Sequence, residues 1–524
     1  MFSFVKKLTK SLKKDGLTIA FKKSIYYSNE LLLKSTISNA KKFLVMVLRP
    51  LSPYFEIYPI PQNTPFDSVY TRNTQRVSNF NINLPQDYIP YGYVDSNVIR
   101  VYKKDEARIF CYTMHVAKYE EVLKRMASQN LLGTVFVKIT HVTPSPEGNY
   151  LLLEQDFVQP TIPAYNYPPA MLYTYAFSLL DFVIALDKVD LHLVDAGIHN
   201  GIYKNGVFKF FDLGAIDLGK MPEPQMLMLI DSIVNPLVLM SHGEIERAYR
   251  YLRWPTNPLL SYRDIKGYMN KKQRVKYRKM LLNVVKHVKK GNVINACEYI
   301  KSFLRSIQLK NSKTIWSDYS VNLLNAIENK ASLSDKYNTA VSLFRKTQSK
   351  SFIDLAGNTG ILSLLLKDEV DYSICADADL NALNYLWEYV QKHTVGNVIP
   401  SFRNLLVNDI RTIRPNEETI TWLKPSHVCE CAFALAILHH LVFTHALGFD
   451  EIVNILFSFT EKYLIVQFID MQYCKQHWEE LRINQFPFYD RANFETALLK
   501  CGRIIEQEVL NDSYKSTFYL LEKY

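Results

Sequence analysis

Apolar runs and helical patterns alternate along the chain from Ser351 onward. Strands are predicted at Ser351–Leu355, Tyr372–Ala376, Cys431–Ala436, Tyr463–Phe468 and Thr517–Leu521. Helices are predicted at Ile361–Lys367 and Leu380–His393, where the apolar residues recur at helical spacing. Strands that alternate with helices are typical of βαβ units, so this part of the chain is expected to form a mostly parallel α/β sheet.

The middle of the chain has a different pattern, with short strands around a single helix. Strands are predicted at Asn97–Tyr102, Ala107–Tyr112, Val135–His141 and Tyr150–Phe157, and a helix at His115–Ser128. A long helical stretch, Pro168–Leu186, follows. This order indicates an α+β domain with a small sheet-containing lobe and a larger helical lobe.

Composition agrees with a folded protein of two or three domains, because the 524 residues are 48% hydrophobic and 13% aromatic. The seven cysteines are scattered without a C-x2-C pair, which indicates a reducing compartment rather than a disulfide framework. The apolar run Phe43–Leu48 is too short to cross a bilayer, and no signal peptide is visible. We therefore expect a cytoplasmic protein that is neither secreted nor membrane-spanning.

Positive charge is concentrated in two segments of a chain whose formal net charge is +11. Residues 1–50 hold eleven Lys and Arg against two acids, with Phe2, Val5, Leu8 and Leu12 at helical spacing. This pattern is typical of an interfacial helix attracted to anionic lipid. A helix packed on its own protein remains an equal alternative. The first interpretation predicts peripheral contact with the inner face of the membrane.

The second basic segment, residues 244–315, carries eighteen Lys and Arg against four acids. Such a block can bind the phosphates of a nucleic acid, a lipid or a nucleotide, but a solvated helical face is the favoured interpretation. No nucleic-acid-binding motif is recognisable, so no specific nucleic acid is expected.

Three polar residues after the long helical stretch have the spacing that phosphoryl transfer uses. Asp195 and Asn200 lie in His192–Asn200, and Asp212 follows the predicted strand Val207–Phe211. In that chemistry a carboxylate lies near the acceptor hydroxyl, an amide five residues later holds a metal, and a second aspartate holds metal against the phosphates. The segment resembles the catalytic and metal-binding loops of the protein-kinase-like fold, which implies a two-lobed domain with Asn200 and Asp212 as Mg ligands if it binds Mg-ATP.

Departures from the kinase pattern weigh against an active kinase. Gly92 stands alone where a Gly-rich loop is expected, and only Arg108 is available to meet Glu120 or Glu121 of the following helix. A retained nucleotide-binding or structural module is therefore favoured. In the plainer alternative, Asp195 and Asn200 form a turn and Asp212 caps a helix.

The turn after the first α/β strand reads Asp354-Leu355-Ala356-Gly357-Asn358-Thr359-Gly360. Glycine lets a backbone approach a cofactor closely, and an acid at the end of the next strand, Asp377, can accept hydrogen bonds from both ribose hydroxyls. The turn is not G-x-G-x-x-G, and its opening acid, Asp354, suits a cationic sulfonium better than a pyrophosphate.

Together with Asp409, which follows at a predicted strand end, and the sequence Leu438-His439-His440-Leu441, these features resemble the motif series of class I S-adenosylmethionine-dependent methyltransferases from about Lys330 to Tyr524. The resemblance implies a Rossmann-like fold that binds S-adenosylmethionine through the residues of these motifs. They are Asp354, Gly357, Asn358, Gly360, Asp377 and Asp409. An ordinary turn at Asp354 and a helix cap at Asp377 are the alternative, and Glu430 is either a sheet-edge residue or an acceptor contact.

His439 and His440 follow the fourth strand, at the open end of the sheet where the methyl acceptor should lie. Transfer to a hydroxyl needs a base, so one of the two is the predicted catalytic residue. The alternative is that one histidine caps a helix and the other packs on the core.

Three regions are expected: a basic amphipathic segment (1–50), a kinase-like domain with a basic helical end (51–315) and a methyltransferase domain (316–524). This order resembles bacterial fused methyltransferases, including nodulation-type proteins, which are linked to surface-glycan synthesis. The resemblance implies O-methylation of a hydroxylated acceptor such as a glycan or lipid-linked saccharide. A bifunctional kinase-methyltransferase or phosphotransferase, and a membrane- or RNA-binding adaptor, are the competing functions.

Overall fold

The computed structural model describes residues 89–524 with short gaps, which are 93–97, 105–106, 113–114, 145–150, 157, 159, 161, 196, 254–259, 310–316, 330–333, 406–427, 478–482 and 511–514. The predicted amphipathic segment 1–50 lies outside the described residues, as does Asp409. All described residues belong to one unit of the chain, Asn83–Tyr524.

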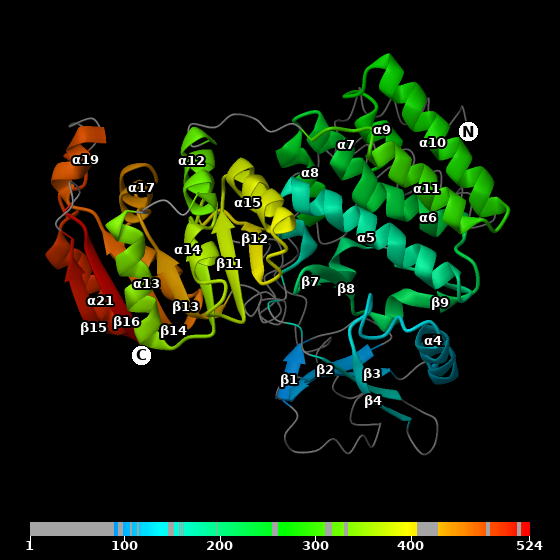
Figure 1. Ribbon diagram of the computed structural model, residues 1–524, viewed down its shortest axis with the longest axis horizontal. Helices are drawn as coiled ribbons and strands as arrows, with labels where there is room; N and C mark the ends of the chain where they lie inside the picture. Colours follow the sequence, from blue (N-terminus) through cyan, green and yellow to red (C-terminus); the bar gives the residue numbers. More distant parts are fainter. Residues whose placement is uncertain are drawn as a thin grey trace, which may run out of the picture. The chain divides into compact units, whose positions relative to one another are not determined.

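A five-stranded antiparallel sheet opens the described part (Figure 1). Its strands are β1 (Ile89–Gly92), β2 (Val98–Lys104), β3 (Ala107–Tyr112), β4 (Ile139–Pro144) and β5 (Leu151–Asp156), in the order β1-β2-β3-β5-β4. Helix α4 (Val116–Ser128) connects β3 to β4. The strand predicted at Val135–His141 begins later than expected, because the amide of Phe136 donates to Leu131 O within the turn around Gly133 instead of joining the ladder.

A mostly helical region follows, into which two small antiparallel strand pairs are set. Its helices are α5 (Pro169–Asp187), α6 (Glu223–Leu229), the π-helical turn η5 (Ile230–Val234), α7 (Asn235–Ser241), α8 (Ile245–Arg253), α9 (Tyr262–Ile265), α10 (Lys271–Lys289) and α11 (Val293–Leu304). The strand pairs are β6 (Leu191–Leu193) with β9 (Ile216–Leu218), and β7 (Gly201–Lys204) with β8 (Val207–Phe210).

Two helical stretches of this region, Pro169–Asp187 and Glu223–Ser241, are long and apolar enough to cross a membrane by length and composition. In the first stretch, 56% of the most apolar 18-residue window is buried inside the protein. In the second stretch, 67% of the corresponding window is buried. That burial is typical of the core helices of a globular domain.

The remaining residues form a seven-stranded sheet in the order β12-β11-β10-β13-β14-β16-β15, parallel except for the pairings of β16. The strands are β10 (Ser351–Leu355), β11 (Tyr372–Asp377), β12 (Val398–Phe402), β13 (Cys429–Ala434), β14 (Thr460–Phe468), β15 (Gly502–Val509) and β16 (Thr517–Lys523). The strand β15, which the sequence pattern does not predict, forms the edge beside β16. Its burial alternates with exposure, as expected for a strand with one face in water.

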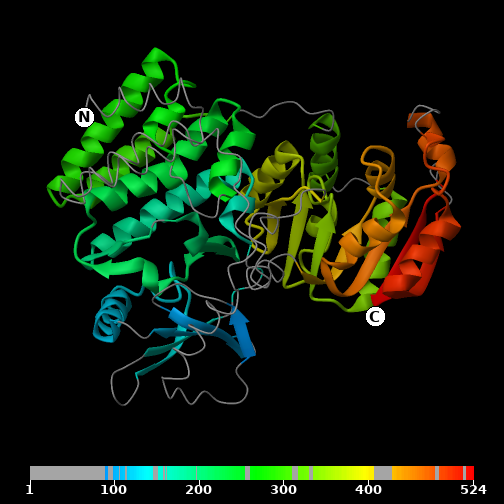
Figure 2. The ribbon, with the colours of Figure 1, turned by 180° about the vertical axis from the view of Figure 1, so that it is seen from behind.

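Helices cover both faces of this sheet (Figures 1 and 2). The helices are α12 (Ser317–Glu328), α13 (Asp335–Thr347), α14 (Ile361–Leu365), α15 (Leu380–Lys392), α17 (Leu438–Phe443), α18 (Phe449–Phe457), α19 (Met471–His477) and α21 (Arg491–Cys501). Helix α15 packs against β11 and β12, whereas α18 packs against β13 and β14 and contacts α21. The predicted mostly parallel α/β sheet is confirmed.

Helix α15 also packs against α5, so the α/β sheet and the helical region share a buried contact. Trp387 is buried, its Nε1 donates to Thr174 Oγ1 at 3.1 Å, and its ring lies 5.1 Å from the ring of Tyr203. The amide of Ala170, in the first turn of α5, donates to Asn384 Oδ1 at 2.9 Å. A side chain from another element thus satisfies one of the free amides that every helix start exposes.

Truncation of Trp387 should destabilise both regions together. We expect Trp387→Ala to lower the free energy of unfolding by about 3–5 kcal/mol through the cavity it leaves. Trp387→Phe, which keeps a ring but loses the bond to Thr174, should cost about 1 kcal/mol from the hydrogen bond, in addition to the lost ring volume. Denaturant unfolding followed by fluorescence and by circular dichroism measures both values. A loss below about 1 kcal/mol in Trp387→Ala would contradict a structural role for this contact.

Candidate functional site

The carboxyl ends of β10 and β11 bring two carboxylates to the same edge of the α/β sheet. Asp354 and Asp377 are the acids, and β10 pairs in parallel with β11 so that Asp354 lies beside Cys375. Burial, and next the charge of Asp377, raises the pKa of Asp354 to about 7. Burial also raises the pKa of Asp377, against hydrogen bonds from the backbone that lower it. A positive charge bound beside this pair would favour the ionised form of both acids, so this edge suits a cationic ligand.

The loop after β10 folds tightly over these acids. Asp377 Oδ2 accepts from the amide of Asn358 at 2.8 Å, and its Oδ1 accepts from the amide of Asp379 at 2.7 Å. Ala356 and Asn358 both have left-handed backbone angles, with φ of 60° and 51°. Both predicted acids are thus in contact with the predicted loop, and Asp377 does not cap α15, because Asp379 does so by accepting from the amides of Asn381 and Ala382.

Close packing requires the first glycine of the loop, Gly357, and a left-handed backbone favours the second, Gly360. A Cβ on Gly357 would lie 2.7 Å from Asp354 Oδ2 and 2.9 Å from Cys375 Sγ. Gly360 has φ of 69°, and a Cβ there would lie 2.7 Å from a methyl group of Leu386. A carboxylate has about four lone-pair sites, so Asp377 can still accept from a hydroxyl beside its backbone hydrogen bonds. The residues present fit the ribose and the cationic end of an adenosyl sulfonium.

Cys375 belongs to this site although it had not been singled out from the sequence. Its thiol donates to Asn358 O at 3.5 Å, and burial raises its pKa well above the ordinary value. Residues two apart in a strand face the same side, so Cys375 and Asp377 both face the loop. That alternation was the signal by which the sequence could have identified it.

His439 and His440 lie in α17, which follows β13 at the same edge of the sheet as Asp354. Their ring centroids are 4.3 Å apart. His439 is buried, while His440 is half-buried and has a pKa lowered by burial and by His445. Neither histidine is the N-cap of α17, which is Ile437. At neutral pH the lowered pKa keeps His440 in the neutral form that accepts a proton.

Glu430 lies at the opposite edge, near the amino end of β13. Its Oε2 accepts from the amide of Lys350, the residue before β10. The carboxyl ends of the parallel strands, where ligands bind in open α/β sheets, are at the other edge. This position favours the sheet-edge role of Glu430 over a contact with the acceptor.

A second group of polar residues forms where β6 and the hairpin β7–β8 end. Asp195 Oδ1 accepts from the amide of Gly197 at 2.9 Å, and Asn200 Nδ2 donates to Asp195 O at 3.2 Å. Asp212 Oδ1 accepts from the amide of Gly214 at 2.8 Å. The amide of Phe211, next to Asp212, donates to Asn200 O at 3.3 Å, so the structure brings all three predicted residues together.

Helix α4 turns Tyr119, rather than Glu120 or Glu121, toward this group. Burial first, and then the charge of Asp212, raises the pKa of Tyr119 to about 12. Glu120 is exposed, and Glu121 Oε1 accepts from Arg125 Nε at 2.7 Å within the same helix. The predicted contact of Arg108 with Glu120 or Glu121 stays a prediction. The side chain of Arg108 lies outside the described ones.

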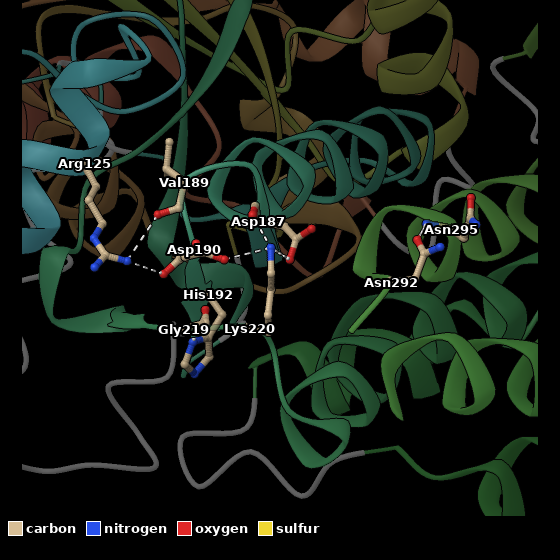
Figure 3. Close-up of polar contacts among 9 residues, drawn as sticks. All are labelled: Arg125, Asp187, Val189, Asp190, His192, Gly219, Lys220, Asn292 and Asn295. Atoms are coloured by element: carbon tan, nitrogen blue, oxygen red, sulfur yellow. Dashed lines mark hydrogen bonds and ion pairs between the residues drawn. The ribbon is translucent and has the colours of Figure 1, made fainter. Parts of the chain in front are cut away.

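Polar contacts fix α4 to the corner between α5 and β6 (Figure 3). Arg125 donates to Asp190 O at 3.1 Å, and Lys220 forms ion pairs with Asp187 at 3.3 Å and Asp190 at 2.9 Å. Cations are favoured beside the free carbonyls at a helix end, and α5 ends at Asp187. Because β6 starts in the same corner, these contacts hold the strand that leads to Asp195.

The described residues contain no cluster of three or more His, Cys, Asp or Glu side chains arranged to hold a metal ion. The Mg role predicted for Asn200 and Asp212 stays a prediction, since it depends on a bound nucleotide to supply the other oxygens.

Comparisons with known proteins give solved structures only: no family model matches the chain, and no curated protein does. The chain is similar to magnesium protoporphyrin IX methyltransferase (ChlM) from Synechocystis PCC 6803, crystallised with bound SAH, at 10% identity and a TM-score of 0.28, covering 50% of this chain and 100% of that one. It is similar to the N-methyltransferase NodS from Bradyrhizobium japonicum WM9 at 8% identity and a TM-score of 0.27, and the match covers 36% of this chain and 94% of NodS. It is also similar to WbdD at 17% identity and a TM-score of 0.26, and the match covers 36% of this chain and 40% of WbdD.

The strand order of the seven-stranded sheet, with β16 antiparallel between β14 and β15, fits the Rossmann-like methyltransferase fold. The glycine loop and the two acids lie at the carboxyl ends of the parallel strands, where open α/β sheets bind their ligands.

Asp354 gives the folded chain a pH dependence of stability. Its pKa of about 7 lies above the ordinary 3.8, so between these values the folded chain keeps a proton that the unfolded chain has released. The free energy of unfolding should fall as the pH rises through this window, by at most about 4 kcal/mol from this group. Urea unfolding at about pH 5 and about pH 8 should show a much smaller loss in Asp354→Asn. An equal fall in the free energy of unfolding in the wild type and in Asp354→Asn would contradict the raised pKa of Asp354.

Proposed function

We propose that the chain is a class I S-adenosylmethionine-dependent methyltransferase, with the cofactor bound at the carboxyl edge of the seven-stranded sheet. The observation that carries the proposal is the pair Asp354 and Asp377 beneath a glycine loop with no room for a Cβ at Gly357. Asp377 would accept from the ribose hydroxyls, and Asp354 would attract the positive charge of the cofactor. S-adenosylmethionine, when bound, supplies an electrophilic methyl group on a sulfonium.

The acceptor is proposed to be a hydroxyl of a glycan or of a lipid-linked saccharide. His439 and His440 support an O-acceptor, because transfer to a hydroxyl requires removal of its proton. His440, with its lowered pKa and half-exposed ring, is the better candidate for the base. In this role it takes the proton from the acceptor oxygen while the loop and Asp377 hold the cofactor in line.

Calorimetric titration with S-adenosylhomocysteine tests the cofactor site. The wild type should bind with micromolar affinity, and Asp377→Asn should bind at least about tenfold more weakly, since it loses charged hydrogen bonds. Asp379→Asn is the matched control, because Asp379 caps α15 two residues away and its side chain accepts from helix amides. No binding by the wild type, or equal losses in both variants, would refute the assignment.

The same proteins separate binding from chemistry. His440→Gln should bind S-adenosylhomocysteine as the wild type does, and methyl transfer to a hydroxylated acceptor should fall by about 10²–10⁴-fold. Transfer at the wild-type rate would remove His440 as the base.

A second proposed function rests on the group Asp195, Asn200 and Asp212. The five-stranded sheet with α4, the loop after β6 and the hairpin β7–β8 come in the order expected for a kinase-like domain. The hydrogen bond from the Phe211 amide to Asn200 O supports the proposal, because it brings the backbone next to Asp212 close to that of Asn200. We propose that this region binds Mg-ATP, with or without phosphoryl transfer.

Titration with ATP in the presence of Mg²⁺ tests that region. Binding in the wild type should fall at least about tenfold in Asp212→Asn, because the metal loses an anionic ligand. Asp217→Asn is the control: Asp217 lies on β9 and forms an ion pair with Lys118 at 3.5 Å. Binding of S-adenosylhomocysteine should not change in either variant. An absence of ATP binding in the wild type would leave the kinase-like region as a structural module.

A further inference from the structure

Helix α10 has a solvent-facing side that neither proposed site uses. Its inward side is formed by Tyr277, Met280, Val284 and Val288, which are buried. On the outward side, Val275 is 61% and Leu282 is 74% exposed. Residues seven apart lie on the same side of an α-helix, so these two side chains form an apolar strip that points away from the protein.

Cations flank that strip on both sides. Residues 271–290 hold nine Lys and Arg and no Asp or Glu. The exposed cations of the outward side include Lys271, Lys272, Lys276, Lys279 and Lys286. Among the ion pairs formed by described residues, the one that involves α10 joins Lys289 to Glu223 at 3.2 Å. The outward side of α10 therefore carries a large positive charge that acids of the described part of the chain leave largely uncompensated.

We propose that the outward side of α10 is a docking surface for an anionic lipid bilayer. Each lysine close to an anionic membrane raises the affinity about fivefold, and an apolar strip between lysines enters the boundary between headgroups and acyl chains. A nucleic acid would neutralise the lysines through its phosphates, but its backbone offers nothing that buries Val275 and Leu282. The exposed apolar centre therefore favours lipid. The proposal is independent of the methyltransferase and nucleotide proposals.

Vesicle sedimentation with the full-length chain tests this surface. The wild type should bind phosphatidylcholine vesicles that contain about 30% phosphatidylserine, bind more weakly as salt rises, and fail to bind phosphatidylcholine alone. The triple variant Lys272→Glu, Lys276→Glu, Lys279→Glu should bind at least about a hundredfold more weakly. The double variant Val275→Ser, Leu282→Ser, which keeps every charge, should lose about tenfold.

The control variant makes the same change in net charge elsewhere. Lys124→Glu, Lys462→Glu and Lys475→Glu alter three exposed lysines outside α10 and should change vesicle affinity less than about threefold. All substituted side chains are exposed, so thermal unfolding should match the wild type in each protein. Binding to a duplex RNA is measured in parallel on the same set.

Three outcomes would overturn the proposal. Equal losses in the α10 charge variant and the control would assign binding to net charge alone. Unchanged vesicle binding in the α10 variants would assign it to another part of the chain. Loss of RNA binding in the charge variant, with vesicle binding unaffected by Val275→Ser, Leu282→Ser, would make α10 a nucleic-acid surface instead.

Discussion

Helix α15 is the constraint on which much of the described structure depends, because it is fixed from both sides. Its first turn begins at Asp379, whose amide donates to the Asp377 carboxylate at the sheet edge. Its outer side buries Trp387 against Tyr203 and donates a hydrogen bond to Thr174 of α5. Helix α5 leads in turn to β6 and Asp195. A displacement of α15 would therefore change the backbone that holds Asp377 and the packing behind the second polar group at the same time.

Close packing of backbones strengthens this contact. The amide of Gly206, in the turn between β7 and β8, donates to Gly396 O at 3.2 Å. A Cβ on Gly396 would lie 2.7 Å from the backbone carbon of Asn205, so glycine is required by the approach itself. Two segments that pack without a side chain between them have little freedom to slide, since a small movement closes the remaining space.

The sequence predicted the local features of the candidate site well and its surroundings poorly. Asp354 and Asp377 could be placed together because the ends of adjacent parallel strands meet at one edge, and the distances confirm contact with the glycine loop. The position of Glu430 at the other edge follows from strand direction alone. The contact of Trp387 with Thr174 could not be predicted, because an apolar helical pattern indicates burial but not the partner. The inward direction of Tyr119 and the outward direction of Glu120 on α4 depended likewise on the packing of a whole helix.

The left-handed backbone at Ala356 and Asn358 has a consequence for how a ligand meets the loop. Residues other than glycine adopt this conformation at a cost in free energy, which the hydrogen bonds of Ala356 to Ala376 O and of Asn358 to Asp377 help to offset. The free-energy cost of fixing the backbone of this turn is therefore met when the chain folds, before any ligand binds. A ligand that arrives finds its contact groups already aligned, so less conformational entropy is lost during the encounter and more of the contact energy remains as affinity.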